Sequence, residues 1–137
     1  MKLLSATLVL VLLVASCAKD PITQAKENFV LNAMTNGKWK VSSFVRGSTD
    51  VTTGFAPYSF QFKTDLTVDA INNGTVEKTG SWSANSTDLT ITSTFTGANA
   101  TLTQLNGTWK ITDNSLTYVK ATQTVGGEVW TLRLDKL

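Results

Sequence analysis

The sequence contains no histidine and one cysteine in 137 residues. Without histidine, the usual general base and the pairing of a serine or cysteine nucleophile with imidazole are absent. A single cysteine excludes an intrachain disulfide, a cysteine-based zinc cluster and an iron–sulfur site. The 12 Lys plus Arg nearly balance the 10 Asp plus Glu, so there is no basic face for nucleic acid. We therefore expect no cofactor, no metal site and no nucleic-acid partner, in a chain whose length fits one domain.

The first 17 residues have the organisation of a secretory signal peptide. Lys2 precedes an uncharged run over residues 3–16, which is shorter than the roughly 20 apolar residues that a membrane-spanning helix needs. The run ends in Val14-Ala15-Ser16-Cys17, which resembles a bacterial lipobox. The resemblance implies diacylation of the Cys17 thiol, cleavage after Ser16 and acylation of the new amino group. An ordinary signal peptide with a chance cysteine is the alternative.

Lipidation of Cys17 would hold the protein on a membrane without a spanning helix, because two or more acyl chains bind stably whereas one binds marginally. Ala18 follows the cysteine in place of Asp, and by resemblance to bacterial sorting rules this favours the outer membrane. Lys19-Asp20 resembles the signals that send some lipoproteins to the cell surface, so the periplasmic and surface-facing leaflets both stay open. We expect a signal peptide over residues 1–16, a lipidated tether and short helix over 17–36, and one folded domain over 37–137.

A short helix is predicted directly after the tether. Asp20-Pro21 is a typical helix start, with Asp as the N-cap and Pro at the first helical position. Apolar residues then recur at steps of three and four, which predicts an amphipathic helix over Pro21–Met34 that closes one end of the domain. A helix lying on the membrane is less favoured, since its polar face carries only Lys26 and Glu27.

From Gly37 onward apolar and polar residues alternate, which is typical of half-buried antiparallel strands. The 23 threonines also favour strands, because a β-branched side chain fits a pleated surface. We predict eight strands, at roughly 38–46, 57–63, 66–72, 75–84, 88–96, 107–113, 115–123 and 127–136. Eight strands in up-and-down order can close into an all-β antiparallel barrel with no exposed edge. A two-sheet β-sandwich is the alternative.

A Gly-x-Trp motif recurs along the chain, as Gly37-Lys38-Trp39, Gly107-Thr108-Trp109 and the shorter Gly80-Ser81-Trp82. Glycine lets the chain enter a strand sharply, and tryptophan is a large inward anchor. With the lipobox, the short helix and the closing strand Trp130–Leu134, this motif resembles the small lipocalin-like lipoproteins of Gram-negative bacteria. The resemblance implies a lipocalin-like barrel in which Arg133 of the last strand stacks on Trp39 of the first.

Lipocalin-like barrels often hold a small apolar ligand, so the resemblance also implies a binding site at the open end. The candidate ligand-binding residues are aromatic side chains at predicted inward positions, where tyrosine hydroxyls could orient a ligand. They are Tyr58, Phe60, Phe62, Trp82, Phe95, Tyr118 and Trp130. The alternative is that these rings fill the interior, since eight strands enclose just enough space for side chains.

Two other classes of function remain. The protein could be a structural or protein-interaction lipoprotein of the cell envelope, binding partners through strand edges or the segment Gly47–Ala56. An enzyme is disfavoured, because Asp65, Asp69, Glu77 and Asp88 lie at turn or outward strand positions, where charged groups are usually solvated. We expect a monomeric, lipid-anchored, non-enzymatic protein.

Overall fold

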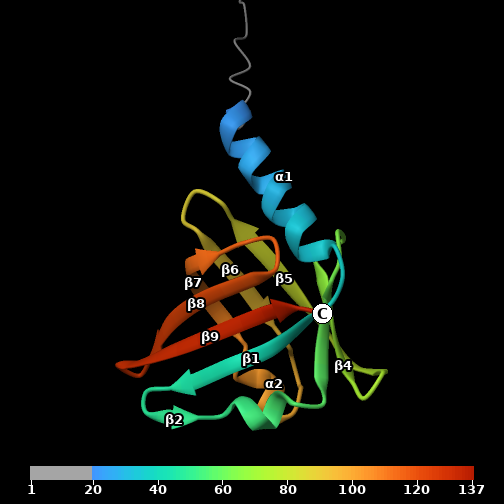
Figure 1. Ribbon diagram of the computed structural model, residues 1–137, viewed down its shortest axis with the longest axis vertical. Coiled ribbons are helices and arrows are strands. Elements are labelled where there is room, and N and C mark those ends of the chain that lie inside the picture. The colour runs from blue at the N-terminus through green and yellow to red at the C-terminus, as the bar shows by residue number, and fades with distance from the viewer. Residues whose placement is uncertain (1–19) are drawn as a thin grey trace, which may run out of the picture.

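The computed structural model describes residues 20–137, so the predicted signal peptide and Cys17 lie outside the described residues. Helix α1 (Pro21–Thr35) stands at one end of a sheet that closes on itself (Figure 1). Asp20 caps α1 as predicted, because its carboxylate accepts hydrogen bonds from the backbone N–H groups of Ile22 and Thr23 at 2.9 and 3.0 Å. Among the described residues, no helix is long and apolar enough to cross a membrane.

The described residues form nine strands, each antiparallel to its neighbours. The strands β1 and β3 to β9 make the barrel, which closes where β1 pairs with β9 and Val41 lies opposite Leu134. The short β2 pairs with the end of β1. The bounds are β1 (Trp39–Arg46), β2 (Thr49–Asp50), β3 (Tyr58–Phe62), β4 (Thr67–Asn72), β5 (Thr75–Asn85), β6 (Thr90–Thr94), β7 (Gly107–Asn114), β8 (Tyr118–Val125) and β9 (Glu128–Lys136). The predicted eight-stranded up-and-down barrel is confirmed, and the sandwich is excluded.

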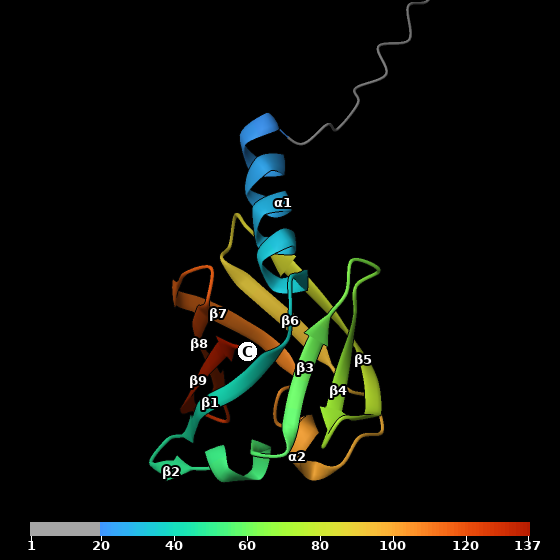
Figure 2. The ribbon, with the colours of Figure 1, turned by 45° about the vertical axis from the view of Figure 1, so that its right-hand side comes forward.

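The two long connections contain structure that the sequence analysis missed. The segment Gly47–Ala56, considered above as one possible partner-binding segment, holds β2 and a 3₁₀ helix, η1 (Thr52–Phe55), and the second connection holds helix α2 (Ala100–Thr103). Both lie at the end of the barrel away from α1 (Figure 2). Phe55 and Leu102 are fully buried there, and the Asn99 side chain caps α2 by accepting from the Leu102 N–H at 2.9 Å. We call this the closed end, and the end that carries α1 the tether end.

The first two Gly-x-Trp copies have the same structural role, since each joins a helix to a strand. Gly37 and Gly107 have φ of +88° and +114°, a region that favours glycine. The Trp39 indole N–H donates to the carbonyl of Met34 in the last turn of α1 at 2.9 Å. The Trp109 indole N–H donates to the carbonyl of Leu105, just after α2, at 3.0 Å. Each tryptophan therefore fills the core and satisfies a carbonyl at a helix end.

The third copy works differently, because Gly80 lies inside β5. A Cβ atom at this position would lie 2.5 Å from the carbonyl oxygen of Thr94 and 2.8 Å from the Phe95 ring. The absence of a side chain lets β6 and Phe95 approach β5 closely. The Trp82 indole N–H donates to the carbonyl of Lys63 at 3.0 Å, which ties β5 to the start of the β3–β4 turn.

Candidate functional site

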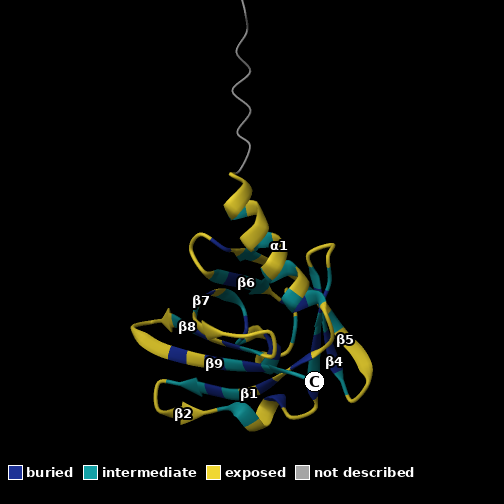
Figure 3. Cartoon of the chain, turned by 45° about the horizontal axis from the view of Figure 1, so that its top comes forward, coloured by how far each residue is buried: buried dark blue, intermediate teal, exposed yellow. Residues whose placement is uncertain are grey.

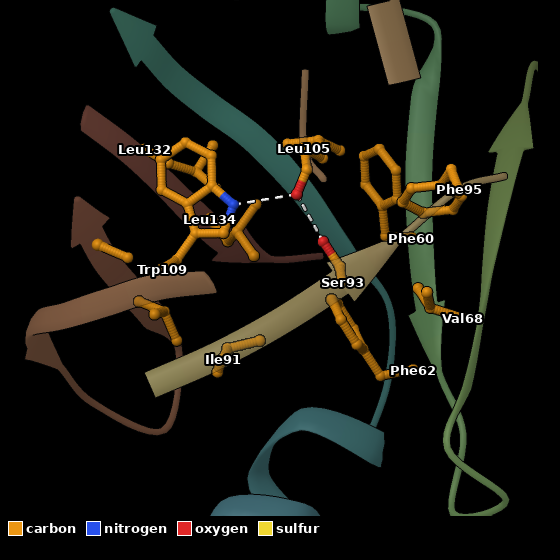
Figure 4. Close-up of a pocket in the computed structure, with 12 residues that line it drawn as sticks. Phe60, Phe62, Val68, Ile91, Ser93, Phe95, Leu105, Trp109, Leu132 and Leu134 are labelled. Carbon is orange, nitrogen blue, oxygen red and sulfur yellow. Dashed lines mark hydrogen bonds between the residues drawn. The ribbon is translucent and has the colours of Figure 1, made fainter. Parts of the chain in front are cut away.

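The barrel interior contains a cavity of about 40 Å³ (Figure 4). Pockets that take drug-sized ligands have volumes of about 300–1,000 Å³, whereas this space fits a water molecule or two. Its walls come from six strands and from Phe95 and Leu105, which lie outside the strands. The lining residues are Phe60, Phe62, Val68, Ile91, Ser93, Phe95, Leu105, Trp109, Val119, Ala121, Leu132 and Leu134.

The polar groups of this lining are used within the protein. The Ser93 hydroxyl donates to the carbonyl of Leu105 at 2.6 Å, and the Trp109 indole N–H donates to the same oxygen at 3.0 Å (Figure 4). Both donors point at one backbone carbonyl and away from the cavity. A ligand in this space would therefore meet apolar surface without a donor to orient it.

The structure brings together three of the seven predicted ligand-binding residues. Phe60, Phe62 and Phe95 line the cavity, and the rings of Phe60 and Phe95 pack edge to face at 6.2 Å. Three other buried residues of the set do not line the cavity. Tyr58 and Trp130 are at the closed end, and the ring of Trp82 packs against Phe62 at a centroid distance of 5.2 Å. Trp109 lines the cavity and was missing from the predicted set, although its motif marked it as an inward anchor.

The prediction that Tyr118 faces the interior of the barrel is wrong. Its neighbour Val119 lines the cavity, and because side chains alternate along a strand, Tyr118 lies on the outer face. There its hydroxyl donates to Asp113 at 3.0 Å, and this hydrogen bond raises the pKa of Tyr118. The strand predicted over 115–123 begins too early, because Leu116 lies in the turn before β8, and the early start puts the wrong set of alternate residues inside.

The implied stacking of Arg133 on Trp39 is also wrong. Arg133 lies between Leu132 and Leu134, which both face the cavity, so its side chain points outward. Its guanidinium donates to both carboxylate oxygens of Asp135 at 2.9 Å and lies 4.7 Å from the centre of the Tyr118 ring. The cation near Trp39 is Lys136, whose Nζ is 5.1 Å from the ring centre and which pairs with Trp39 across β1 and β9.

The closed end carries a hydrogen-bonded polar cluster. The Tyr58 hydroxyl donates to Glu77 at 2.5 Å and accepts from the Asn99 amide at 2.9 Å. Burial, together with the hydrogen bond to Glu77, raises the pKa of Tyr58. The cluster joins β3, β5 and the start of α2, so its groups hold the closed end together.

The carboxylates considered for acid–base chemistry are engaged by structural partners, and Asp65 and Asp69 both lie near Lys63. Asp69 contacts Lys63 at 3.0 Å and accepts from the Thr79 hydroxyl at 2.6 Å, and the hydrogen bond from Thr79 lowers the pKa of Asp69. Asp65 accepts from the N–H and the hydroxyl of Thr67 in the β3–β4 turn. Within residues 20–137, no group of three or more histidine, cysteine, aspartate or glutamate residues is placed to hold a metal ion.

A larger hollow lies outside the barrel at the tether end, with a volume of about 550 Å³. One wall is the exposed side of α1, and the other is formed by the β5–β6 turn and the end of β7. The lining residues are Pro21, Ile22, Ala25, Lys26, Phe29, Val30, Ser86, Leu89 and Asn114. We call this hollow the tether groove. Figure 3 shows that most of α1 beside it is exposed.

The architecture is similar to that of a solved structure. The chain is similar to a DUF4847 family protein from Bacteroides vulgatus, with a TM-score of 0.55, 15% sequence identity and coverage of 77% of this chain and 96% of that chain. It also aligns with an uncharacterized protein from Bacteroides eggerthii at a TM-score of 0.48 and 14% identity, over 74% of this chain and 98% of that chain. No protein-family model and no curated protein matches the sequence. At this identity, the likeness to the Bacteroides vulgatus protein shows a common barrel fold.

Proposed function

We propose that this protein is a lipid-anchored outer-membrane protein of a Gram-negative bacterium that acts through its outer surface and is not an enzyme. The observation that carries the proposal is the filled barrel, whose interior cavity is about 40 Å³ and has no free donor aimed into it. A carrier of small apolar molecules needs a far larger interior. The structural or protein-interaction role is thus favoured over ligand binding inside the barrel.

The anchor in this proposal is Cys17, supported by the lipobox-like Val14–Cys17 at the end of an uncharged run. The test is metabolic labelling with an alkyne fatty acid in a Gram-negative host, followed by membrane fractionation. The wild-type protein is expected to take up label and to sediment with membranes. Cys17→Ser is expected to lose both, and since the chain has no other cysteine, no second thiol can substitute. Equal labelling of the two proteins would contradict the anchor.

A second experiment tests whether the protein is sorted to the outer membrane rather than to the inner membrane. Ala18 follows the acylated residue in the proposed mature chain, and Asp at this position is the residue that favours retention in the inner membrane. Ala18→Asp is expected to move the protein from the outer-membrane to the inner-membrane fraction of a sucrose gradient, with Ala18→Ser as the matched control that does not move. No redistribution in Ala18→Asp would remove the support for outer-membrane sorting.

A further inference from the structure

Large apolar side chains are exposed at the tether end. Ile22 and Phe29 on α1 are 69% and 56% exposed, and Leu89 and Leu116, in the turns after β5 and β7, are 50% and 58% exposed. Ile22, Ala25 and Phe29 are spaced by three and four residues, so they form one stripe along the helix. The prediction that α1 closes one end of the barrel therefore fits only the last turn of the helix. Its last turn packs on the core through Met34, while this stripe faces outward.

The stripe and the β5–β6 turn face each other across the tether groove. Ile22 and Phe29 line one side, and Leu89 and Ser86 line the other. Ser86 is buried at the groove, and its hydroxyl makes no hydrogen bond to any part of the chain that the structure describes. Because the Ser86 hydroxyl oxygen has almost no accessible surface, the exposed lining of the groove is mainly apolar. Lys26, the charged residue of the lining, adds a cation at the same place.

Leu89 is held in an unfavourable backbone conformation. Its φ is +53°, which lies in the left-handed region that suits glycine and is unfavourable for a residue with a Cβ atom. At the closed end, the β8–β9 turn has two glycines, Gly126 and Gly127, at its positive φ positions. The tether end therefore presents an exposed leucine at a position where glycine would be more stable.

The chain leading into α1 determines what can lie against this surface. Cys17 is three residues before Asp20, and since an extended residue spans at most about 3.6 Å, the two are separated by no more than roughly 11 Å. The first turn of α1, with Ile22, therefore lies close to any membrane that holds the acyl chains of Cys17. Ile22 and Leu89 line the same groove, so a membrane that contacts Ile22 also lies near Leu89.

We propose that the tether groove, lined by Ile22, Phe29 and Leu89, docks onto the lipid surface in which Cys17 is anchored, together with the exposed Leu116 in the turn after β7. The apolar side chains enter the acyl region, and Lys26 lies near the phosphates. This inference rests on the proposed lipid anchor. It adds a fixed orientation, with the tether end on the membrane and the closed end directed away from it.

The test uses the lipidated full-length protein in vesicles of phosphatidylethanolamine and phosphatidylglycerol. Because acylation blocks Cys17, a single new cysteine can be labelled selectively with an environment-sensitive fluorophore. Leu89→Cys and Phe29→Cys report on the groove, and Val129→Cys is the matched control, since Val129 is 54% exposed at the closed end. Nitroxide-bearing acyl chains in the vesicles then quench any fluorophore that enters the membrane.

The proposal predicts a roughly twofold or greater loss of fluorescence at positions 89 and 29, and no loss at position 129, because only the first two enter the acyl region. Vesicle flotation separates the possible failures. A protein that does not float with vesicles refutes the lipid anchor. A protein that floats while all three positions stay unquenched overturns the docking inference alone. The inference is also overturned if positions 89 and 29 become protected only when envelope proteins are added, because the groove would then bind a protein.

Discussion

The two ends of the barrel are built in opposite ways. At the closed end, η1 and α2 bury Phe55 and Leu102, and Tyr58, Glu77 and Asn99 satisfy one another by hydrogen bonds. At the tether end, the turns expose leucines, and a helix stands mostly free of the barrel (Figures 1 and 3). The difference indicates that the closed end stabilises the fold, whereas the tether end presents a surface.

The largest expected effect comes from matched leucine truncations at the two ends. Leu102→Ala removes a fully buried side chain at the closed end and is expected to cost about 2–5 kcal/mol, because it leaves a cavity. Leu116→Ala at the tether end is expected to change stability by no more than about 0.5 kcal/mol. Urea denaturation followed by tryptophan fluorescence measures both free energies of unfolding. Similar losses for the two variants would show that the two ends contribute equally to stability.

The wall that joins the two ends depends on Gly80. Gly80→Ala places a Cβ atom against the carbonyl of Thr94 and the ring of Phe95, and such overpacking costs about 1–3 kcal/mol. Gly74→Ala is the control, because a Cβ atom there meets nothing within 4 Å and is opposed only by the φ of +86°. The urea midpoint is expected to fall further for Gly80→Ala than for Gly74→Ala. The reverse order would show that the close approach of β5 and β6 is not a constraint.

Asparagine side chains that cap the local backbone at the two ends are expected to differ by a smaller amount. Asn99 caps α2 and also donates to Tyr58, whereas Asn85 accepts only from the local backbone N–H groups of Thr87 and Asp88 and donates to the Asp88 side chain. Asn99→Ala is expected to lower stability by about 0.5–2 kcal/mol, as for the loss of a helix N-cap. Asn85→Ala is expected to lower stability by a smaller amount. Thermal unfolding of both variants tests this order, which would be reversed if the β5–β6 turn stabilised the fold more than α2 does.

The smallest expected effect is a pH dependence located at Asp135 in β9. The Arg133 guanidinium lowers the pKa of Asp135 to about 2, and the Ser42 hydroxyl also donates to this carboxylate. A lowered folded-state pKa contributes stability above the unfolded pKa of about 3.9, and this contribution is lost as pH falls towards 2. Because the pair is partly exposed, we expect about 1 kcal/mol.

Asp135→Asn removes this titration. The difference in unfolding free energy between the wild type and Asp135→Asn is expected to be constant from about pH 6 to pH 4 and to shrink between about pH 4 and pH 2. Arg133→Gln removes the partner charge, so this variant is also expected to lose less stability than the wild type between about pH 4 and pH 2. If the stability difference between the wild type and Asp135→Asn grew as the pH fell, the pKa of Asp135 would not be lowered in the folded protein.

Local patterns were enough to predict the architecture. Alternation of apolar and polar residues gave all eight barrel strands to within about three residues, and Asp20-Pro21 gave the start of α1. The Gly-x-Trp motifs marked inward anchors, and all three tryptophans are buried. These features depend on neighbours within a few residues, which a single sequence contains.

What could not be predicted depends on distant residues. The cavity volume is set by how side chains from β3 to β9 interdigitate, and no pattern within one strand determines it. Tyr118 was misplaced because the turn before β8 includes Leu116, which shifts the inward positions by one residue. The exposure of Ile22 and Phe29 was hidden because a helical apolar stripe looks the same whether it packs on a barrel or faces away from it.

Native mass spectrometry tests the central claim of a filled barrel most directly. The sample is the chain from residue 20 to 137, secreted to the periplasm of a Gram-negative host and purified without detergent. Ala121→Val, which adds two methyl groups to the cavity wall, is the paired control. The account predicts the bare polypeptide mass for both proteins, also after incubation with fatty acids and sterols. An additional mass that the wild type retains and that Ala121→Val loses would show a ligand inside the barrel and would contradict the account.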